Sequence, residues 1–320
     1  MRKHYLLGLV ISITFLYLVL HKVKLSETIK VIKSANPFYF ILIIILLIFV
    51  LICRSFRWKI MSSDYKTIPI TKFFESLSVA LMTNNIIPFR AGDIVQVLFL
   101  GYKTELSKST ILSTVIMEKL CDFFVMGFII FCSSFFVLLP KIFSVEKVGI
   151  LLLIIIACLI IAIKFRDKLI GLIDKMLPEN RVKVKIKNII KKFYSGLEFF
   201  NQLKIFLTVI FFTIIIWFLC SLQIYFIMIS AGIKLNIFVA IFILALTGLA
   251  AIVPSSPGYI GSLEFLVITG LGIFGIDESQ AFGFTIIYRL MTWLPITLLG
   301  MLILIKNNIS IKDIKRMSRE

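Results

Sequence analysis

The sequence predicts an all-α polytopic membrane protein. Hydrophobic residues make up 60% of the 320-residue chain, against roughly 45–50% in soluble domains. Mean hydropathy is +1.04, and only 16% of the residues are charged. Uncharged runs such as 205–231 reach the ~20 residues that a helix needs to cross the hydrocarbon core. These runs are too long for barrel strands and lack their alternation of polar and apolar residues.

Uninterrupted apolar segments predict membrane helices at 5–20, 37–53, 110–139, 149–165, 205–231, 236–253 and 281–305. The segments 72–99 and 254–275 are also apolar, but proline, glycine and polar residues interrupt them. Such breaks free backbone groups, which must face protein or a water-filled cavity. Each broken segment is expected to cross or to re-enter. Counting 254–275 as a crossing and 72–99 as re-entrant gives about eight transmembrane helices.

The whole chain, 1–320, is expected to form one integral membrane domain. Its first half covers about 1–165 and its second half about 205–305. Between them, 166–204 carries apolar residues at three- and four-residue spacing with lysines on the remaining positions. This pattern predicts a basic amphipathic connector at the cytoplasmic interface. It serves either to capture anionic lipid or simply to link the halves in keeping with the positive-inside rule.

The basic residues indicate how the chain is oriented. The net charge of +18 is concentrated in loops and tails, mainly 54–72, 166–204 and 306–320. These segments fall on one side of the predicted topology, so both termini are expected to be cytoplasmic in a multi-pass protein of the cell membrane. The loop 21–36 is more basic than an outside loop should be. Nucleic acid is not an expected partner, because anionic lipid accounts for the basic excess.

The N-terminal segment resembles a signal peptide only in part. Basic residues precede the apolar run 5–20, but His21 and Lys22 follow it where a cleavage site would need small residues. An uncleaved first helix is expected.

No catalytic or cofactor chemistry is predicted. The two histidines and five cysteines show no metal-ligand spacing, so no metal site is expected. The sequence has no Walker loop, no GxSxG and no HExxH motif. We therefore expect no cofactor and no enzyme activity.

Seven charged residues fall within apolar segments. A charge near the bilayer centre costs about 2.5–3.5 kcal/mol on insertion scales, so such charges are usually paired or functional. Glu118 and Asp122 share a helix face and need a cation between them, for which Arg90 and Arg289 are the candidates. The alternative is that these charges only fix helices together. The seven residues are Arg90, Asp93, Glu118, Lys119, Asp122, Glu264 and Arg289.

The two broken segments follow the same pattern, which suggests an inverted repeat. In each, a proline is followed by glycine and then by an acid. Glu118 follows Asp93 at the same sequence separation as Arg289 follows Glu264. Paired broken segments in the two halves of a chain indicate a central binding site in transporter-like folds. The backbone positions concerned are Pro88, Gly92, Pro257, Gly258 and Gly261.

These motifs resemble those of a known family. The run from Asn85 to Asp93, with Glu118 to Asp122, is similar to the N-terminal half of the lysylphosphatidylglycerol synthase transmembrane family, also called flippase-like or UPF0104. The run from Pro254 to Glu264, followed by Arg289, is similar to its C-terminal half. The resemblance extends over about 5–305.

Two positions depart from the family pattern. Lys119 stands where the family usually has arginine, and Tyr259 stands where it often has a second glycine. Lysine is a weaker bidentate partner for phosphate or carboxylate. In the bifunctional synthases this domain precedes a soluble aminoacyl-transferase. Here the sequence ends at Glu320, so lysyl transfer is not expected.

The resemblance implies a lipid translocase that moves a phospholipid or a lipid-linked head group between leaflets. Arg90 and Arg289 would contact its phosphate. The four membrane acids would hold those arginines or bind a cationic head group. Expected partners are anionic or head-group-modified lipids, and a separate synthase or transferase. The alternatives are an accessory protein for such a transferase and a membrane enzyme that acts on a lipid carrier.

Overall fold

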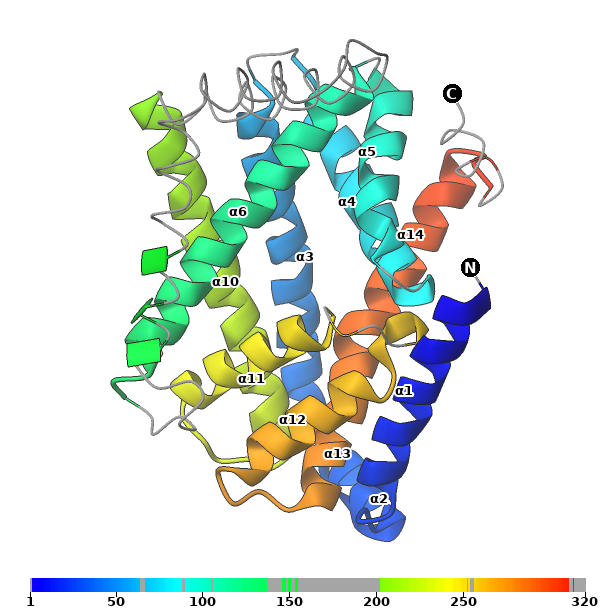
Figure 1. Ribbon diagram of the computed structural model, residues 1–320, viewed down its shortest axis with the longest axis vertical. Helices are drawn as coiled ribbons and strands as arrows, with labels where there is room; N and C mark the ends of the chain where they lie inside the picture. Colours follow the sequence, from blue (N-terminus) through cyan, green and yellow to red (C-terminus); the bar gives the residue numbers. More distant parts are fainter. Residues whose placement is uncertain are drawn as a thin grey trace, which may run out of the picture.

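The computed structural model describes residues 2–63, 67–87, 90–104, 106–136, 146–147, 149–150, 153–154, 202–251, 253, 256–310 and 313. Over these residues the chain is helical and contains no strand (Figure 1). The all-α prediction is confirmed. Most of the predicted helix at 149–165 and of the connector 166–204 lies outside the described residues, so both stay predictions.

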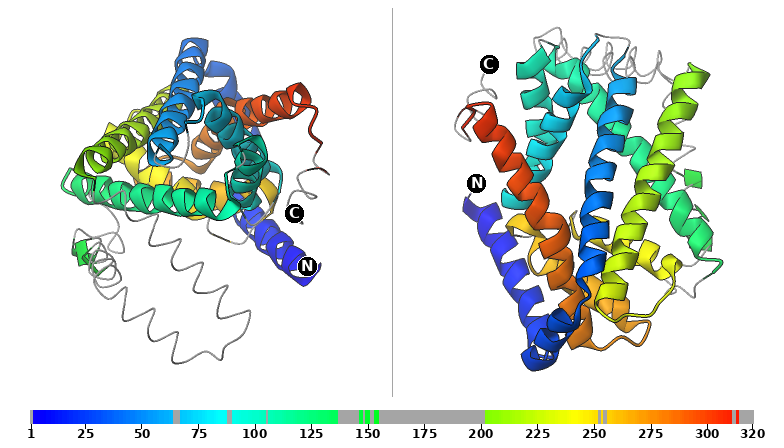
Figure 2. Two further views of the ribbon diagram at one scale, coloured as in Figure 1. Left: turned by 90° about the horizontal axis from the view of Figure 1, so that it is seen from above. Right: turned by 180° about the vertical axis from the view of Figure 1, so that it is seen from behind.

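Among the described residues, three helices are long and apolar enough to cross a membrane. They are α3 (Pro37–Met61), α10 (Leu203–Ser230) and the continuous helix Glu278–Lys306. The third consists of α13 (Glu278–Tyr288), a π-turn η4 (Arg289–Trp293) and α14 (Leu294–Lys306). Helices α3 and α10 pack side by side (Figure 2, right). The chain is therefore an integral membrane protein.

Helix α3 is longer than predicted. Its start is fixed by Asn36, whose side chain accepts a hydrogen bond from the Phe38 backbone N–H at 2.9 Å, and by proline at the first turn. No glycine or proline then interrupts the helix before it ends at Met61. Arg54 and Arg57 therefore belong to the helix, and their assignment to a cytoplasmic loop after 53 is wrong.

The first broken segment forms a hairpin of two helices, α4 (Ile70–Ile86) and α5 (Ala91–Thr104), packed against each other. Helix α5 has 14 residues and spans about 21 Å, too little to cross ~30 Å of hydrocarbon. Gly92 allows the close approach, since a Cβ there would lie 2.0 Å from the Ala80 carbonyl oxygen. Of the two possibilities left open for 72–99, the structure shows the one in which the segment folds back. Pro88 lies outside the described residues.

The second broken segment forms a hairpin too, from α11 (Ile237–Ala250) and α12 (Ser262–Gly272). These helices have 14 and 11 residues, so neither reaches across the hydrocarbon core. The segment 254–275, which the predicted topology counted as a crossing, turns back instead.

Glycine makes the tip of this second hairpin possible. The tip contains a short 3₁₀ turn, η3 (Pro257–Tyr259). Gly258 and Gly261 have φ of 70° and 90°, a region that side chains with a Cβ rarely adopt. A Cβ on Gly261 would also lie 2.4 Å from the Ser12 carbonyl oxygen of the first helix. The predicted glycines are thus turn residues.

The two hairpins enter from opposite ends of the molecule (Figure 1). The first half runs α3, α4, α5 and α6 (Lys108–Ser133). The second half runs α10, α11, α12 and the α13–α14 helix, each element in the opposite direction. Helix α4 contacts η3, so the hairpin tips meet inside the molecule. This is the inverted repeat that the sequence suggests.

Two helices precede the repeat. Helix α1 (Arg2–Leu20) packs against α12, where the rings of Phe15 and Phe265 stack with centroids 4.7 Å apart. Helix α2 (Leu25–Ser34) lies in the segment 21–36, which was predicted as a loop. It packs against α13, with the Thr28 hydroxyl donating to the Ser279 carbonyl oxygen at 3.1 Å. Helix α1 therefore supports the second hairpin, and helix α2 supports the start of the final long helix.

Candidate functional site

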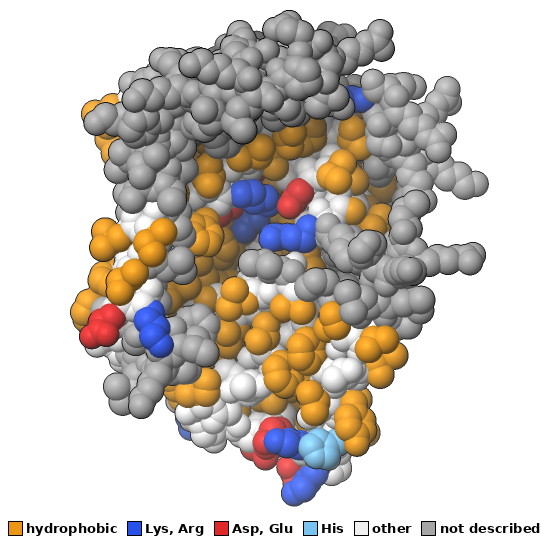
Figure 3. Space-filling model, in the orientation of Figure 1, with side chains coloured by type: hydrophobic (Ala, Val, Ile, Leu, Met, Phe, Trp, Pro, Cys, Tyr) orange, Lys and Arg blue, Asp and Glu red, His pale blue; other side chains and the backbone are white. Residues whose placement is uncertain are grey.

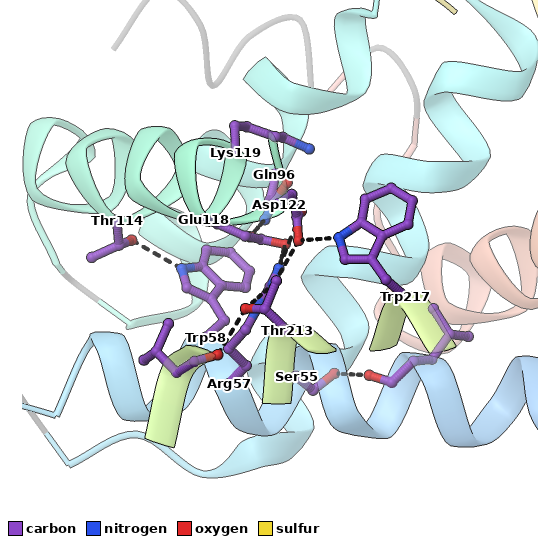
Figure 4. A network of polar contacts seen from close by, with 12 residues as sticks. Ser55, Arg57, Trp58, Gln96, Thr114, Glu118, Lys119, Asp122, Thr213 and Trp217 are labelled. Atoms are coloured by element: carbon purple, nitrogen blue, oxygen red, sulfur yellow. Dashed lines mark hydrogen bonds and ion pairs between the residues drawn. The ribbon is translucent and has the colours of Figure 1, made fainter. Parts of the chain in front are cut away.

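A buried ion network joins α3 to α6 (Figure 4). The Arg57 side chain is 0% exposed. Its Nη2 lies 2.8 Å from Glu118 Oε1, and its Nη1 lies 2.6 Å from Asp122 Oδ1. The two acids share one face of α6, as predicted. The cation between them is Arg57, so the candidates Arg90 and Arg289 are wrong for this role.

Neutral donors and acceptors complete this network. The Thr213 hydroxyl accepts a hydrogen bond from Arg57 at 2.9 Å, and the Trp217 indole N–H donates to Asp122 at 3.2 Å. The Gln96 amide donates to the second oxygen of Glu118 at 3.3 Å. The network therefore ties α3, α5 and α6 of the first half to α10 of the second. Buried charges survive in an apolar interior when they are paired and hydrogen-bonded in this way.

A second ion pair joins helix α12 of the α11–α12 hairpin to the final long helix. Arg289 Nε lies 2.6 Å from Glu264 Oε1, and Arg289 Nη1 donates to the Gly258 carbonyl oxygen at 2.8 Å. The other Glu264 oxygen accepts from the Gly261 N–H at 2.7 Å and so caps the start of α12. Arg289 begins the π-turn η4, a distortion that often marks functional sites. The pair links the hairpin tip to the final helix.

The third cluster lies at the tip of the α4–α5 hairpin and is half-exposed. Lys119 Nζ lies 3.2 Å from Asp93 Oδ1, and Arg90 Nε lies 3.9 Å from Asp93 Oδ2. Their side chains are 39%, 32% and 43% exposed for Lys119, Asp93 and Arg90. Arg90 has a φ of 52°, which marks the turn into α5. A charged group able to bind a ligand is thus accessible here.

The second and third clusters are equivalent under the repeat. Asp93 is the third residue of α5, and Glu264 is the third residue of α12. Each acid reaches forward to a cation on the next long helix, Lys119 or Arg289. Lys119 therefore forms in the first half the kind of ion pair that Arg289 forms in the second. This symmetry explains why the two broken segments have the same sequence pattern.

A groove lies between α5 and α6. Its volume is about 710 Å³, and its lining is mostly apolar, with Val97, Leu112 and Phe123 among the wall residues. Asp93 and Lys119 line the same groove. Figure 3 shows basic and acidic side chains in a recess bordered by hydrophobic ones on the face that carries α6. Apolar walls beside an ion pair suit an amphiphile with an acyl chain and a polar head.

A separate cavity lies between the two halves. It measures about 260 Å³ and is lined by residues from α3, α4, α10, α11, α12, η3, α13, η4 and α14. Arg54, Asn85, Tyr259, Arg289 and Trp293 line it, and none of its lining residues is an acid. The lining of this cavity therefore includes two arginines and no acid among mostly apolar residues.

The structure brings the predicted residues together in three groups instead of one. Pro257, Gly258 and Gly261 shape the second tip, and Gly92 shapes the first. Sequence reasoning missed Arg54 and Arg57 because charge was taken to end the helix at 53. The uninterrupted helix-forming run up to Met61 was the available signal. In the part of the chain that the structure describes, no group of His, Cys, Asp or Glu is arranged to hold a metal ion.

The family of this inverted-repeat membrane protein is defined by comparison with known proteins. The model of the lysylphosphatidylglycerol synthase TM region matches residues 5–300, and the chain belongs to that family. A UPF0104 membrane protein of Methanocaldococcus jannaschii is 26% identical, with 91% of each chain covered. Another, from Pyrococcus horikoshii, is 24% identical, with 95% of this chain and 97% of the relative covered. Membership of this family is consistent with a lipid-related role in a membrane.

Proposed function

We propose that this protein is a lipid translocase, which moves a phospholipid or a lipid-linked head group between leaflets without altering it covalently. One observation carries the proposal: two hairpins, entering from opposite ends, meet inside the molecule with an ion cluster at each tip. Half-length helices that end inside the membrane are the way transporters build a polar site at mid-depth.

The groove between α5 and α6 supports a lipid as the cargo. A head group must leave water to change leaflet, and its charges need partners on the way. Asp93, Lys119 and Arg90 offer both signs of charge at a half-exposed position. The apolar walls of the groove would keep an acyl chain in a hydrophobic environment. Cationic and anionic parts of one head group thus both find a partner.

We place the protein in the cell membrane with both termini cytoplasmic. With the predicted helix 149–165 included, the number of crossings is even, which would keep the termini on one side, and the basic loops favour the cytoplasm. Impermeant labelling of single cysteines tests this orientation in a variant whose native cysteines are replaced by serine or alanine. A cysteine at position 310 should be protected in intact cells, and one at Lys30 should react.

The function is tested with purified protein in liposomes that carry fluorescent lipids in both leaflets. Bleaching of the outer leaflet measures how fast inner-leaflet lipid becomes accessible. We expect exchange faster than in protein-free liposomes, at a rate that depends on the head group. Lipids extracted afterwards should have unchanged mass. A product of altered mass would instead establish a membrane enzyme, and no exchange by folded protein would refute the proposal.

A further inference from the structure

Three donors on the cavity between the two halves have no hydrogen-bond acceptor among the described residues. Arg54 Nε, Arg289 Nη2 and Trp293 Nε1 are each buried without a hydrogen-bond partner. All three residues line the same cavity. Buried donors are nearly always satisfied in folded proteins, and leaving one unmade costs about 1–3 kcal/mol. Three such donors on one cavity indicate that something else accepts their hydrogen bonds.

Arg54 also lacks a direct ion-pair partner. Among the residues that the structure describes, no carboxylate lies within ion-pair distance of it. The acid that acts on it at longer range is Asp122, which is already paired with Arg57. Arg289 differs, because Glu264 neutralises it. The cavity therefore presents one guanidinium, Arg54, that no carboxylate contacts directly.

The donors are held in place before any ligand arrives. The Asn85 amide donates to the Trp293 carbonyl oxygen at 3.1 Å and to the Thr297 hydroxyl at 2.9 Å, which fixes the start of α14. Glu264 and the Gly258 carbonyl oxygen orient the Arg289 guanidinium and leave Nη2 directed elsewhere. Donors fixed by the surrounding structure bind an anion with little loss of entropy.

We propose that this cavity binds one phosphate-type oxyanion, the phosphate of the lipid head group, through Arg54, Arg289 Nη2 and Trp293 Nε1. Guanidinium groups match the geometry of phosphate oxygens and form strong charge-assisted hydrogen bonds with them. The volume of about 260 Å³ admits a head group but not acyl chains. The site rests on the proposed translocation, for which it supplies a halfway position inside the molecule.

Calorimetric titration of the detergent-solubilised protein tests the site without measuring transport. The probes are short-chain phosphatidic acid, a matched diacylglycerol without phosphate, and inorganic phosphate. We expect phosphatidic acid to bind and diacylglycerol not to. Arg54→Gln should weaken binding about tenfold or more, since a hydrogen bond to a charged group is lost together with the charge. Trp293→Phe should weaken it a few-fold while keeping the ring.

Matched variants and a transport assay separate the possible results. Lys30→Gln removes a charge from the exposed surface of α2 and should bind as the wild type does. Competition by inorganic phosphate would support the anion site and show that the lipid part adds little affinity. Unchanged binding in both folded cavity variants would overturn the proposal. If phosphatidic acid binds but no lipid exchanges between leaflets, the anion site is supported and translocation is refuted. If the protein exchanges lipid and Arg54→Gln leaves the rate unchanged, the site is refuted and translocation is not.

Discussion

Arg57 holds two carboxylates in the interior, so its removal should be far more damaging than that of either acid. Arg57→Gln leaves Glu118 and Asp122 facing each other on one side of α6, with no cation within ion-pair distance of both. Breaking a buried pair by removing one partner typically costs 3–5 kcal/mol. We expect a loss of about that size in the free energy of unfolding.

The same geometry predicts a rescue. Asp122→Asn should cost less than Arg57→Gln, because Arg57 keeps its contact with Glu118 at 2.8 Å. The triple variant Arg57→Gln, Glu118→Gln, Asp122→Asn removes all three charges of this network, so most of the lost stability should return. Denaturant unfolding in detergent micelles measures all three variants. Equal losses for Arg57→Gln and the triple variant would refute the reasoning, since the damage would then come from lost packing.

Three further predictions concern the hairpins. Gly92→Ala should destabilise the protein by about 1–3 kcal/mol, because the new Cβ would lie 2.0 Å from a backbone oxygen of α4. Gly101→Ala on the same helix should be tolerated, since no neighbour lies nearer than 3.5 Å to its new Cβ. Equal melting temperatures for the two variants would contradict the close packing of α5 against α4. Gly261→Ala should cost more than Gly272→Ala, since only the former has a positive φ of 90° and a blocked Cβ; comparable unfolding midpoints would contradict this. Lys119→Gln removes a half-exposed ion pair, which should cost at most about 1 kcal/mol of stability. It should nevertheless slow leaflet exchange, whereas Lys119→Arg should preserve exchange. If stability and exchange fell together in Lys119→Gln, Lys119 would have a structural role only.

The sequence was informative where local chemistry determines structure. Proline and glycine at 254–261 predicted a break, and the break is a turn because Gly258 and Gly261 adopt positive φ. The matching pattern around Asp93 and Glu264 predicted a repeat, and both acids occupy the third position of their helices. Short-range signals of this kind depend only on neighbouring residues.

Predictions failed where distant residues determine the result. A charge after a hydrophobic run usually marks the membrane boundary, so Arg54 and Arg57 were assigned to a loop. Arg57 remains inside because Glu118 and Asp122 on α6 compensate it. That pairing depends on how α3 packs against α6, which hydropathy does not encode. The crossing assigned to 254–275 failed similarly, since the segment length fitted a crossing and a hairpin equally well.

The rate of leaflet exchange in liposomes tests the central claim most directly when Glu264 and Asp93 are neutralised. These acids pair with Arg289 and Lys119 at the two hairpin tips. Wild type and Lys30→Gln should exchange labelled phospholipid faster than protein-free liposomes, and Asp93→Asn combined with Glu264→Gln should reduce the rate to the protein-free level while the protein stays folded. Exchange by the folded double variant at the wild-type rate would contradict the account, because lipid would then cross without the charges at the hairpin tips.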